Sequence, residues 1–321
     1  MTSPHNKAQI TTMLIQSTYK KIAQCFLDFK GLRLKWPLRG IRLITLTLFI
    51  TVSLTACIAI KLTYHQADRI LSWYADDYFD LNRDQVAALK IQLAPLLQWH
   101  RRTQLPDYVQ LISQIEKKLQ GPIDVEDAHW LNNQLKQRYL KIAEEISRPA
   151  DSFLFNLSPQ NLKALRKKFS KDNRKYIQEN QLDESLESQQ EARVDRLYKN
   201  IEEWTGRLTR AQKEIIQKSL NLIPATEKLR LEEHRLRQKA LLKLWDSVED
   251  RAVFNKGLHD WLTQWEMERT LPMAQQFNDT REQKFKLYVK IYQMLSTEQR
   301  QNILTRLIDL KDDLLQLSNE S

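Results

Sequence analysis

The residue with the most specific chemical setting in this sequence is Cys57. It completes the string Leu54-Thr55-Ala56-Cys57, in which a branched apolar residue and two small residues precede a thiol. This is the spacing of a bacterial lipobox, where a signal peptidase recognises the three residues before the cysteine and the thiol takes up a lipid. The string therefore predicts cleavage before Cys57 and a covalent lipid on its sulfur.

The residues before Cys57 have the layout of a secretory signal. Residues 43–56 form an uncharged run, and it follows a basic stretch made by Lys20, Lys21, Lys30, Arg33, Lys35, Arg39 and Arg42. We expect residues 1–56 to be a leader with an unusually long basic region, unless translation starts further in. The alternative is an uncleaved signal-anchor, because residues 43–60 are uncharged and about 18 apolar residues suffice to cross a bilayer. Both arrangements place the body outside the cytoplasm.

Most of the net positive charge of the chain lies in the leader. Residues 1–56 hold 8 of the 50 Lys and Arg and 1 of the 40 Asp and Glu, which leaves 42 basic and 39 acidic residues after them. A net charge of about +3 on that remainder argues against nucleic acid as a partner. Cleavage would also remove Cys25, so Cys57 would have no intrachain disulfide partner.

The composition after residue 56 predicts an all-α protein. Only Gly121, Gly206 and Gly257 remain there, whereas turns of β-rich folds and phosphate-binding loops need glycine. Leu, Gln, Lys, Glu and Arg, which favour helices, are abundant. We expect residues 57–321 to form an elongated antiparallel bundle of about eight to nine helices without a sheet. This bundle could consist of two lobes that divide near residues 206–224.

Four similar strings predict where helices begin. Each has a leucine, a capping residue and, three positions after the cap, an amide side chain; the strings start at Leu81, Leu157, Leu208 and Leu295. The cap accepts a hydrogen bond from the first turn and the amide reaches back to the cap. Further along, we expect a helix from 124 to about 148, ended by Pro149, and one long helix over 158–204 whose stretch 178–193 projects into solvent.

The sequence offers little for catalysis or metal binding. Glu126 and His129 have the Glu-x-x-His spacing of a helical iron ligand pair, but a di-iron site needs a second copy that this chain lacks. We therefore expect His129 to be an ordinary packed or surface residue. With no G-x-S-x-G or H-E-x-x-H string present, the sequence predicts a protein that is not an enzyme, with no catalytic residue, no metal and no cofactor besides the lipid on Cys57.

Two segments are candidates for an interaction patch. The first is rich in aromatic and acidic residues, and the second is basic; their members are Trp73, Tyr74, Asp76, Asp77, Tyr78 and Asp80, and Trp99, His100, Arg101 and Arg102. They could recognise a partner or a lipid headgroup. The alternative is that the aromatic side chains pack in the core while the acids face water, and that the arginines pair with acids such as Asp76, Asp77 and Asp80.

Together these motifs resemble a family of Gram-negative lipoproteins of unknown function. The resemblance rests on the lipobox, on Trp73-Tyr74-x-Asp76-Asp77-Tyr78-x-Asp80-Leu81 and on Trp99-His100-Arg101-Arg102-x-Gln104-Leu105-Pro106-x-Tyr108. It implies a secreted, lipid-anchored helical protein without an established activity. The leucine-cap-x-x-Gln strings are also similar to those of Spy/CpxP-type periplasmic chaperones, which implies a chaperone-like role.

These observations predict a cellular location and a kind of function. Ile58 follows the cysteine, and in lipoproteins of this type it is Asp at that position that holds the protein at the inner membrane. We therefore expect a non-enzymatic binding, scaffolding or chaperone-like module, held by acyl chains at the periplasmic face of the outer membrane, with a protein partner that the sequence does not identify. The alternative is a single-pass inner-membrane protein with a regulatory or envelope-assembly role.

Overall fold

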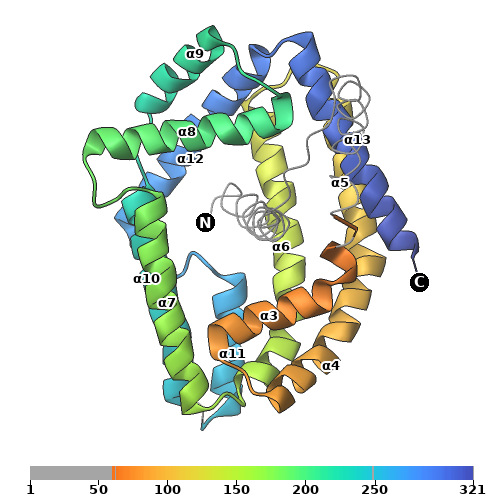
Figure 1. Ribbon diagram of the computed structural model, residues 1–321, viewed down its shortest axis with the longest axis vertical. Coiled ribbons are helices and arrows are strands. Elements are labelled where there is room, and N and C mark those ends of the chain that lie inside the picture. Colours follow the sequence, from red (N-terminus) through yellow and green to blue (C-terminus); the bar gives the residue numbers. More distant parts are fainter. Residues whose placement is uncertain (1–59, 62, 248, 321) are drawn as a thin grey trace, which may run out of the picture. The chain divides into compact units, whose positions relative to one another are not determined.

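The computed structural model describes residues 60–61, 63–247 and 249–320, and all regular structure in these ranges is helical (Figure 1). Cys57, the lipobox and the leader lie outside them. The predicted all-α class is confirmed, but eight to nine helices was too few, since eleven α-helices lie within residues 67–319. They are α3 (Ala67–Phe79), α4 (Arg83–Trp99), α5 (Leu105–Leu119), α6 (Val125–Leu154), α7 (Pro159–Glu179), α8 (Leu186–Thr205), α9 (Arg210–Asn221), α10 (Glu227–Lys243), α11 (Arg251–Thr263), α12 (Leu271–Gln293) and α13 (Thr297–Asn319). A π-helix, η1 (His100–Gln104), and a 3-10 helix, η2 (Leu244–Ser247), complete the order.

Residues Ala67–Ser321 form one compact unit, which has two clusters of buried apolar side chains. The first joins α8, α9 and α12 through residues such as Val194, Ile216 and Ile291. The second is centred on Phe254 of α11 and Leu241 of α10, and the end of α6 packs against it. Helix α5 lies along α13. In the described part of the chain, no helix combines the length and the apolar content that crossing a membrane requires.

The four predicted helix starts are all confirmed. Asn82, Ser158, Thr209 and Ser296 cap α4, α7, α9 and α13, and each cap closes a reciprocal capping box with the amide three residues later. A capping box satisfies two backbone N–H groups that would otherwise have no partner in the helix. Helix α6 begins with a fifth box, formed by Asp124 and Asp127.

The amides of these boxes also pair with one another, which the local strings could not reveal. Gln212 and Gln299 exchange two side-chain hydrogen bonds of 2.7 and 3.0 Å, joining the starts of α9 and α13. Asn161 accepts a bond of 2.9 Å from Gln85, which joins the starts of α4 and α7. The capping residues therefore serve both local helix formation and long-range assembly.

The prediction of one long helix over 158–204 is wrong, because the chain turns between α7 and α8. Gln181 has a left-handed φ of 53°, and the N–H groups of Gln181 and Leu182 donate to the carbonyl oxygens of Gln178 and Ile177. This is a Schellman ending in which glutamine occupies the place usually held by glycine. Most residues of the stretch 178–193 are exposed, as predicted, but the stretch is not one projecting helix, and Leu182 and Arg193 are buried.

The prediction that a helix ends at Pro149 is also wrong. Helix α6 continues through Pro149 to Leu154. Ala150 and Leu154 pack against the Phe254 cluster, and the buried carboxylate of Asp151 lies 3.1 Å from Arg251. Packing of the last turn against α11 therefore outweighs the hydrogen bond that proline removes.

Candidate functional site

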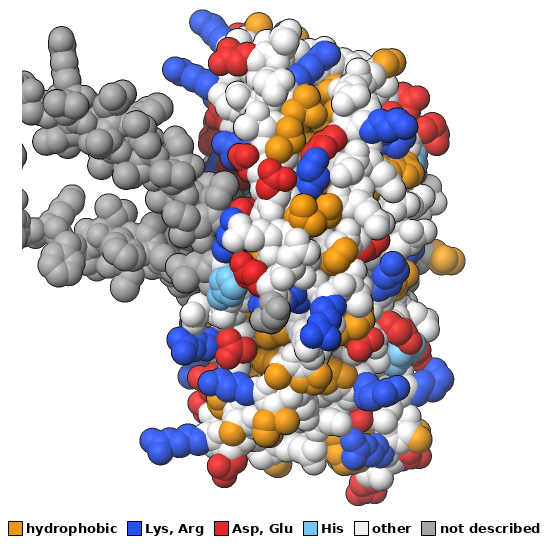
Figure 2. Space-filling view, turned by 90° about the vertical axis from the view of Figure 1, so that its right-hand side faces the viewer, with side chains coloured by type: hydrophobic (Ala, Val, Ile, Leu, Met, Phe, Trp, Pro, Cys, Tyr) orange, Lys and Arg blue, Asp and Glu red, His pale blue; other side chains and the backbone are white. Residues whose placement is uncertain are grey.

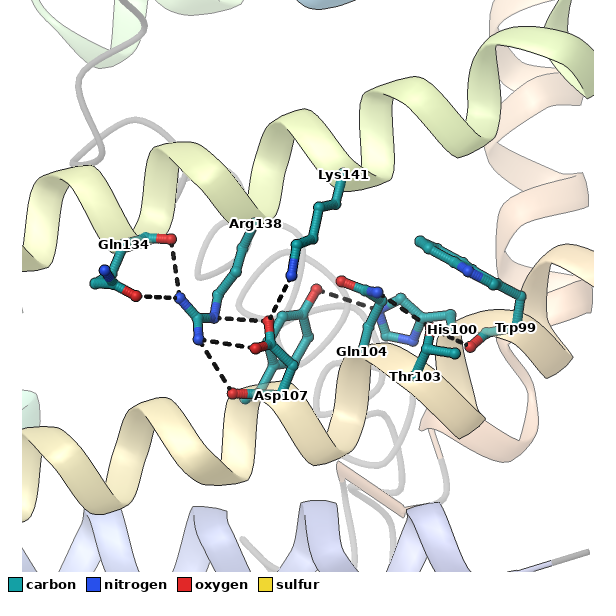
Figure 3. Close-up of polar contacts among 9 residues, drawn as sticks. Trp99, His100, Thr103, Gln104, Asp107, Gln134, Arg138 and Lys141 are labelled. Carbon is teal, nitrogen blue, oxygen red and sulfur yellow. Dashed lines mark hydrogen bonds and ion pairs between the residues drawn. The ribbon is translucent and has the colours of Figure 1, made fainter.

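The segment from Trp99 to Tyr108 does not interrupt the helix, because α4 continues through η1 into α5 (Figure 3). The N–H of Leu105 donates to the carbonyl oxygen of His100, five residues earlier, which defines the wide π-turn. Proline rings clash with the carbonyl four residues before them, and the wider turn gives the ring of Pro106 room. Single π-turns inside α-helices are frequent at functional sites.

Gln104 is the buried residue of the π-turn, His100 and Arg101 are half-buried, and Arg102 and Thr103 are exposed. Gln104 is 4 % exposed and donates to Thr103 Oγ1 at 3.1 Å, while its amide oxygen has no hydrogen-bond partner among the described residues. His100 Nε2 lies 3.4 Å from the hydroxyl of Tyr108. Burial lowers the pKa of His100 to about 4, so the imidazole is neutral at neutral pH.

One turn further along, Asp107 is held by Arg138 of α6 (Figure 3). Arg138 Nη2 donates to Asp107 Oδ1 at 3.0 Å and Arg138 Nε lies 3.0 Å from Oδ2, a bidentate arrangement. Gln134 Oε1 accepts a bond of 2.8 Å from the same guanidinium, and Lys141 Nζ lies 3.8 Å from Asp107. The segment thus joins α4, α5 and α6 rigidly.

The two arginines of the predicted patch lie apart from its acids. Arg101 is half-buried and donates to the carbonyl oxygen of Glu320 at 3.3 Å, whereas Arg102 is exposed. Asp77 pairs with Lys168 at 2.8 Å. Asp77 therefore pairs with a cation of α7.

The aromatic residues of the first segment divide between the core and the surface of α3. Tyr78 packs edge-on against Phe169 of α7, with 6.4 Å between ring centres, and Lys168 lies over its ring. Burial, and then the charge of Asp172, raise the pKa of Tyr78 above its ordinary value. Trp73, in contrast, is 49 % exposed and contacts Tyr74 edge-on.

The acids of that segment face solvent and serve local structure. Asp76 Oδ1 accepts a bond of 2.9 Å from the N–H of Leu81, and Asp80, with a left-handed φ of 51°, ends α3. Asp76, Asp77 and Asp80 are exposed. Tyr78 therefore fits the expected core packing, and Trp73 is the exposed aromatic residue of the segment.

His129 has ordinary neighbours. Its Nε2 lies 2.9 Å from a carboxylate oxygen of Glu282, and its ring packs edge-on against Phe285. Within the described residues, no three His, Cys, Asp or Glu side chains come together in a way that could hold a metal ion.

Several buried arginines pair with carboxylates or carbonyl oxygens inside the protein. Arg269, with a 3 % exposed side chain, contacts the buried carboxylate of Glu233. Arg193 donates to the carbonyl oxygen of Ile223 at 2.8 Å and lies 3.7 Å from Glu227. Burial raises the pKa of Glu233 to about 7, against the opposing charges of Arg230 and Arg237. These pairs hold helices together and present no free charge to a ligand.

A groove between α7 and α10 is different, because its cations are exposed instead of buried. The groove has a volume of about 620 Å³ and contains five cations and one acid, Asp246. The five cations are Arg166, Arg174, Arg235, Lys239 and Lys243. All five are exposed, and within the described part of the chain none of them pairs with a carboxylate. We call this surface the α7/α10 groove.

The floor of the α7/α10 groove is partly apolar. Phe169, Ile177 and Leu242 are half-buried there, and the amides of Asn173 and Gln238 exchange hydrogen bonds of 2.8 and 3.2 Å across it. The helices are antiparallel, since Tyr176 meets His234 while Asn173 meets Gln238. The face seen in Figure 2 differs, because acidic, basic and apolar side chains are interspersed on it.

The sequence analysis did not identify this groove. A local signal existed, since Arg235, Lys239 and Lys243 follow one another at four-residue steps, as do Arg166, Ser170 and Arg174. Such steps place side chains on one face of a helix. That the two faces meet could not be deduced, because the pairing of α7 with α10 is a tertiary contact.

Comparison with known proteins identifies the family of this chain but provides no activity that could be assigned to it. No curated protein and no solved structure matches it. A family model matches residues 77–270, which include the π-turn, the Asp107–Arg138 pair and the whole α7/α10 groove. The chain belongs to this family, DUF6279, a family of unknown function.

Proposed function

We propose that this protein is a lipid-anchored, non-enzymatic binding protein that holds an anionic partner in the α7/α10 groove. The observation that carries the proposal is the set of five exposed cations that line one groove. Among the described residues none of them pairs with a carboxylate, and Arg174 donates only to the neutral hydroxyl of Ser170, at 2.8 Å. Charged side chains at protein surfaces are usually interspersed with opposite charges, as on the face in Figure 2. A concentration of one sign in a concave surface raises the local concentration of oppositely charged ligands.

The anchor in this proposal is supported by the sequence. The lipobox ends at Cys57, after an uncharged run and a basic region. Each buried methylene contributes about 0.8 kcal/mol, so two or more acyl chains hold a protein firmly at a membrane. The residue after the cysteine favours the outer membrane, with the body in the periplasm.

Metabolic labelling with a clickable palmitate tests the anchor. We expect label on the wild-type chain, no label on Cys57→Ser, and release of that variant from the membrane fraction. If Cys57→Ser stays in the membrane fraction with an intact leader, the alternative of a signal-anchored protein with a regulatory or assembly role is correct, and the lipid anchor is refuted.

Photo-crosslinking in intact cells tests the binding surface. A benzophenone amino acid at Ser170 faces the groove, and one at Lys171 occupies the next position of α7 outside it. We expect a discrete crosslinked product from position 170 and none from position 171. Equal products from both positions would show that the groove is not the binding surface.

A further inference from the structure

We infer that the partner in the α7/α10 groove is an acidic, amphipathic α-helical segment of another protein. This inference rests on the proposed function, because it names the occupant of the same surface. It follows from three properties of the groove, which are its length, the arrangement of its cations and the chemistry of its floor.

The length of the groove suits a short helix. Along α7 it extends from Arg166 to Ile177, which at 1.5 Å per residue is about 17 Å. An α-helix of about 11 residues, or three turns, has the same length. Both walls of the groove are helices, and a third helix can lie against two neighbours in the way helices pack in bundles.

The cations lie along both walls at intervals that match a helix. Given the antiparallel contacts of Asn173 with Gln238 and of Tyr176 with His234, Arg174 lies near Arg235, and Arg166 lies near Lys243. Lys239 lies between these two ends. Successive cations on α10 are one turn apart, so carboxylates at four-residue steps on an incoming helix would meet them in register.

The floor of the groove selects an amphipathic occupant. Phe169, Ile177 and Leu242 offer apolar surface between the two rows of cations. A helix with a stripe of apolar residues flanked by Asp and Glu would cover this floor while its acids reach the rims, which is the helix-in-groove mode of recognition. A planar membrane surface would meet the rim cations and leave the floor uncovered, so the shape favours a peptide over anionic lipid headgroups.

Binding of a designed peptide tests the inference. The full chain is held in phosphatidylcholine nanodiscs and titrated with a fluorescent helical peptide of about 15 residues that carries a leucine stripe flanked by Glu. We expect saturable binding that weakens with salt. A peptide with the same Glu residues and Ser in place of Leu should bind at least about tenfold more weakly, since its apolar contacts are lost.

Matched variants place the binding on the groove. Arg235→Glu with Lys239→Glu reverses two groove cations at four-residue spacing, and we expect about tenfold weaker binding or more. Lys167→Glu with Lys171→Glu makes the same change on the exposed surface of α7 outside the groove, and we expect unchanged affinity. Equal loss in both variants would overturn the inference, because non-specific attraction would then account for the binding.

Competition separates the inference from the proposed function. Phosphatidylglycerol vesicles and the unlabelled peptide are each used to displace the fluorescent peptide. If the vesicles do so at a lower concentration of accessible headgroups than the concentration of unlabelled peptide that is needed, the inference is overturned in favour of a lipid partner. Absence of peptide binding, together with a groove-specific crosslink in cells, would also overturn it but leave the groove as a binding surface. Loss of the crosslink would remove the proposed function itself.

Discussion

The amide pair of Gln212 and Gln299 should be a main determinant of stability. Gln299 is 7 % exposed and Gln212 is 8 % exposed. The amide oxygen of Gln299 accepts from the N–H of Ser296 at 3.0 Å, and its Nε2 donates to the carbonyl oxygen of Arg207 at 3.0 Å. Gln299→Met keeps the shape of the side chain and removes all of these bonds, so Gln212 loses its two bonds to Gln299 and keeps only those to Thr209 and Met294.

The cost of this change can be estimated. An intramolecular hydrogen bond contributes about 0.5–1.5 kcal/mol, and the Gln299 amide makes four, so we expect Gln299→Met to lower the free energy of unfolding by about 3 kcal/mol. Gln212→Met also removes four bonds and should cost a similar amount. The two bonds between the amides are lost in either single variant, so we expect the double variant to cost about 4 kcal/mol, below the sum of the single changes.

Urea unfolding followed by far-ultraviolet circular dichroism measures these differences. With a denaturant dependence of about 3 kcal/mol per molar, Gln299→Met should lower the midpoint by about 1 M. Gln301→Met is the control, since it lies on the exposed side of α13, and we expect a change of less than about 0.5 kcal/mol. Additive effects of Gln212→Met and Gln299→Met, or a Gln299→Met midpoint equal to that of Gln301→Met, would refute the reasoning.

Three further predictions use the same unfolding measurement. Asp107→Asn should cost about 2–3 kcal/mol because it leaves the charge of Arg138 buried, and an unchanged midpoint would show that the pair is dispensable. Gly206→Ala should cost about 2 kcal/mol, because its φ of 77° disfavours a side chain and an added Cβ would lie 3.1 Å from Asn302 Nδ2. Gly121→Ala should be nearly neutral, because its added Cβ would lie at an ordinary contact distance of 3.9 Å from the carbonyl oxygen of Lys118, and equal costs at the two glycines would contradict this expectation. Burial, and then Arg230 and Arg237, lower the pKa of His234 to about 4, so below pH 6.5 the unfolded chain binds a proton that the folded chain does not. Stability should therefore fall by about 2 kcal/mol from pH 7 to pH 5 through His234 and by a similar amount through His100, and a slope unchanged in His234→Gln would exclude His234 as a cause.

Local chemistry made part of the fold predictable. The caps Asn82, Ser158, Thr209 and Ser296 act through hydrogen bonds within one turn, so their positions could be deduced from the sequence. The turn at Gln181 could not, because a left-handed φ is usually occupied by glycine and no glycine lies there. Each of these outcomes depends on residues close together in the chain.

Long-range contacts account for what the sequence did not reveal. Pro149 does not end α6, because Asp151 and Leu154 pack against α11, about a hundred residues later in the chain. Arg193 lies in a polar stretch but is buried against the carbonyl oxygen of Ile223. The candidate site was missed for the same reason, because the cations of α7 and α10 form a groove only when the two helices are side by side.

The segments first predicted as an interaction patch have several structural roles. His100 is a buried, neutral residue of the π-turn, and Asp77 and Tyr78 pack against α7. Their dense and unusual composition is thus partly explained by packing. Trp73, nearly half exposed on α3, is the member of the patch with the largest open apolar surface.

The most direct test of the central claim is the yield of the crosslinked product from position 170 in living cells when the charge of the groove is reversed. We predict that Arg235→Glu with Lys239→Glu lowers this yield about tenfold, at equal protein abundance, and that Lys167→Glu with Lys171→Glu leaves it unchanged. A yield that is the same in the groove variant as in the wild type would contradict the assignment of the α7/α10 groove as the binding surface.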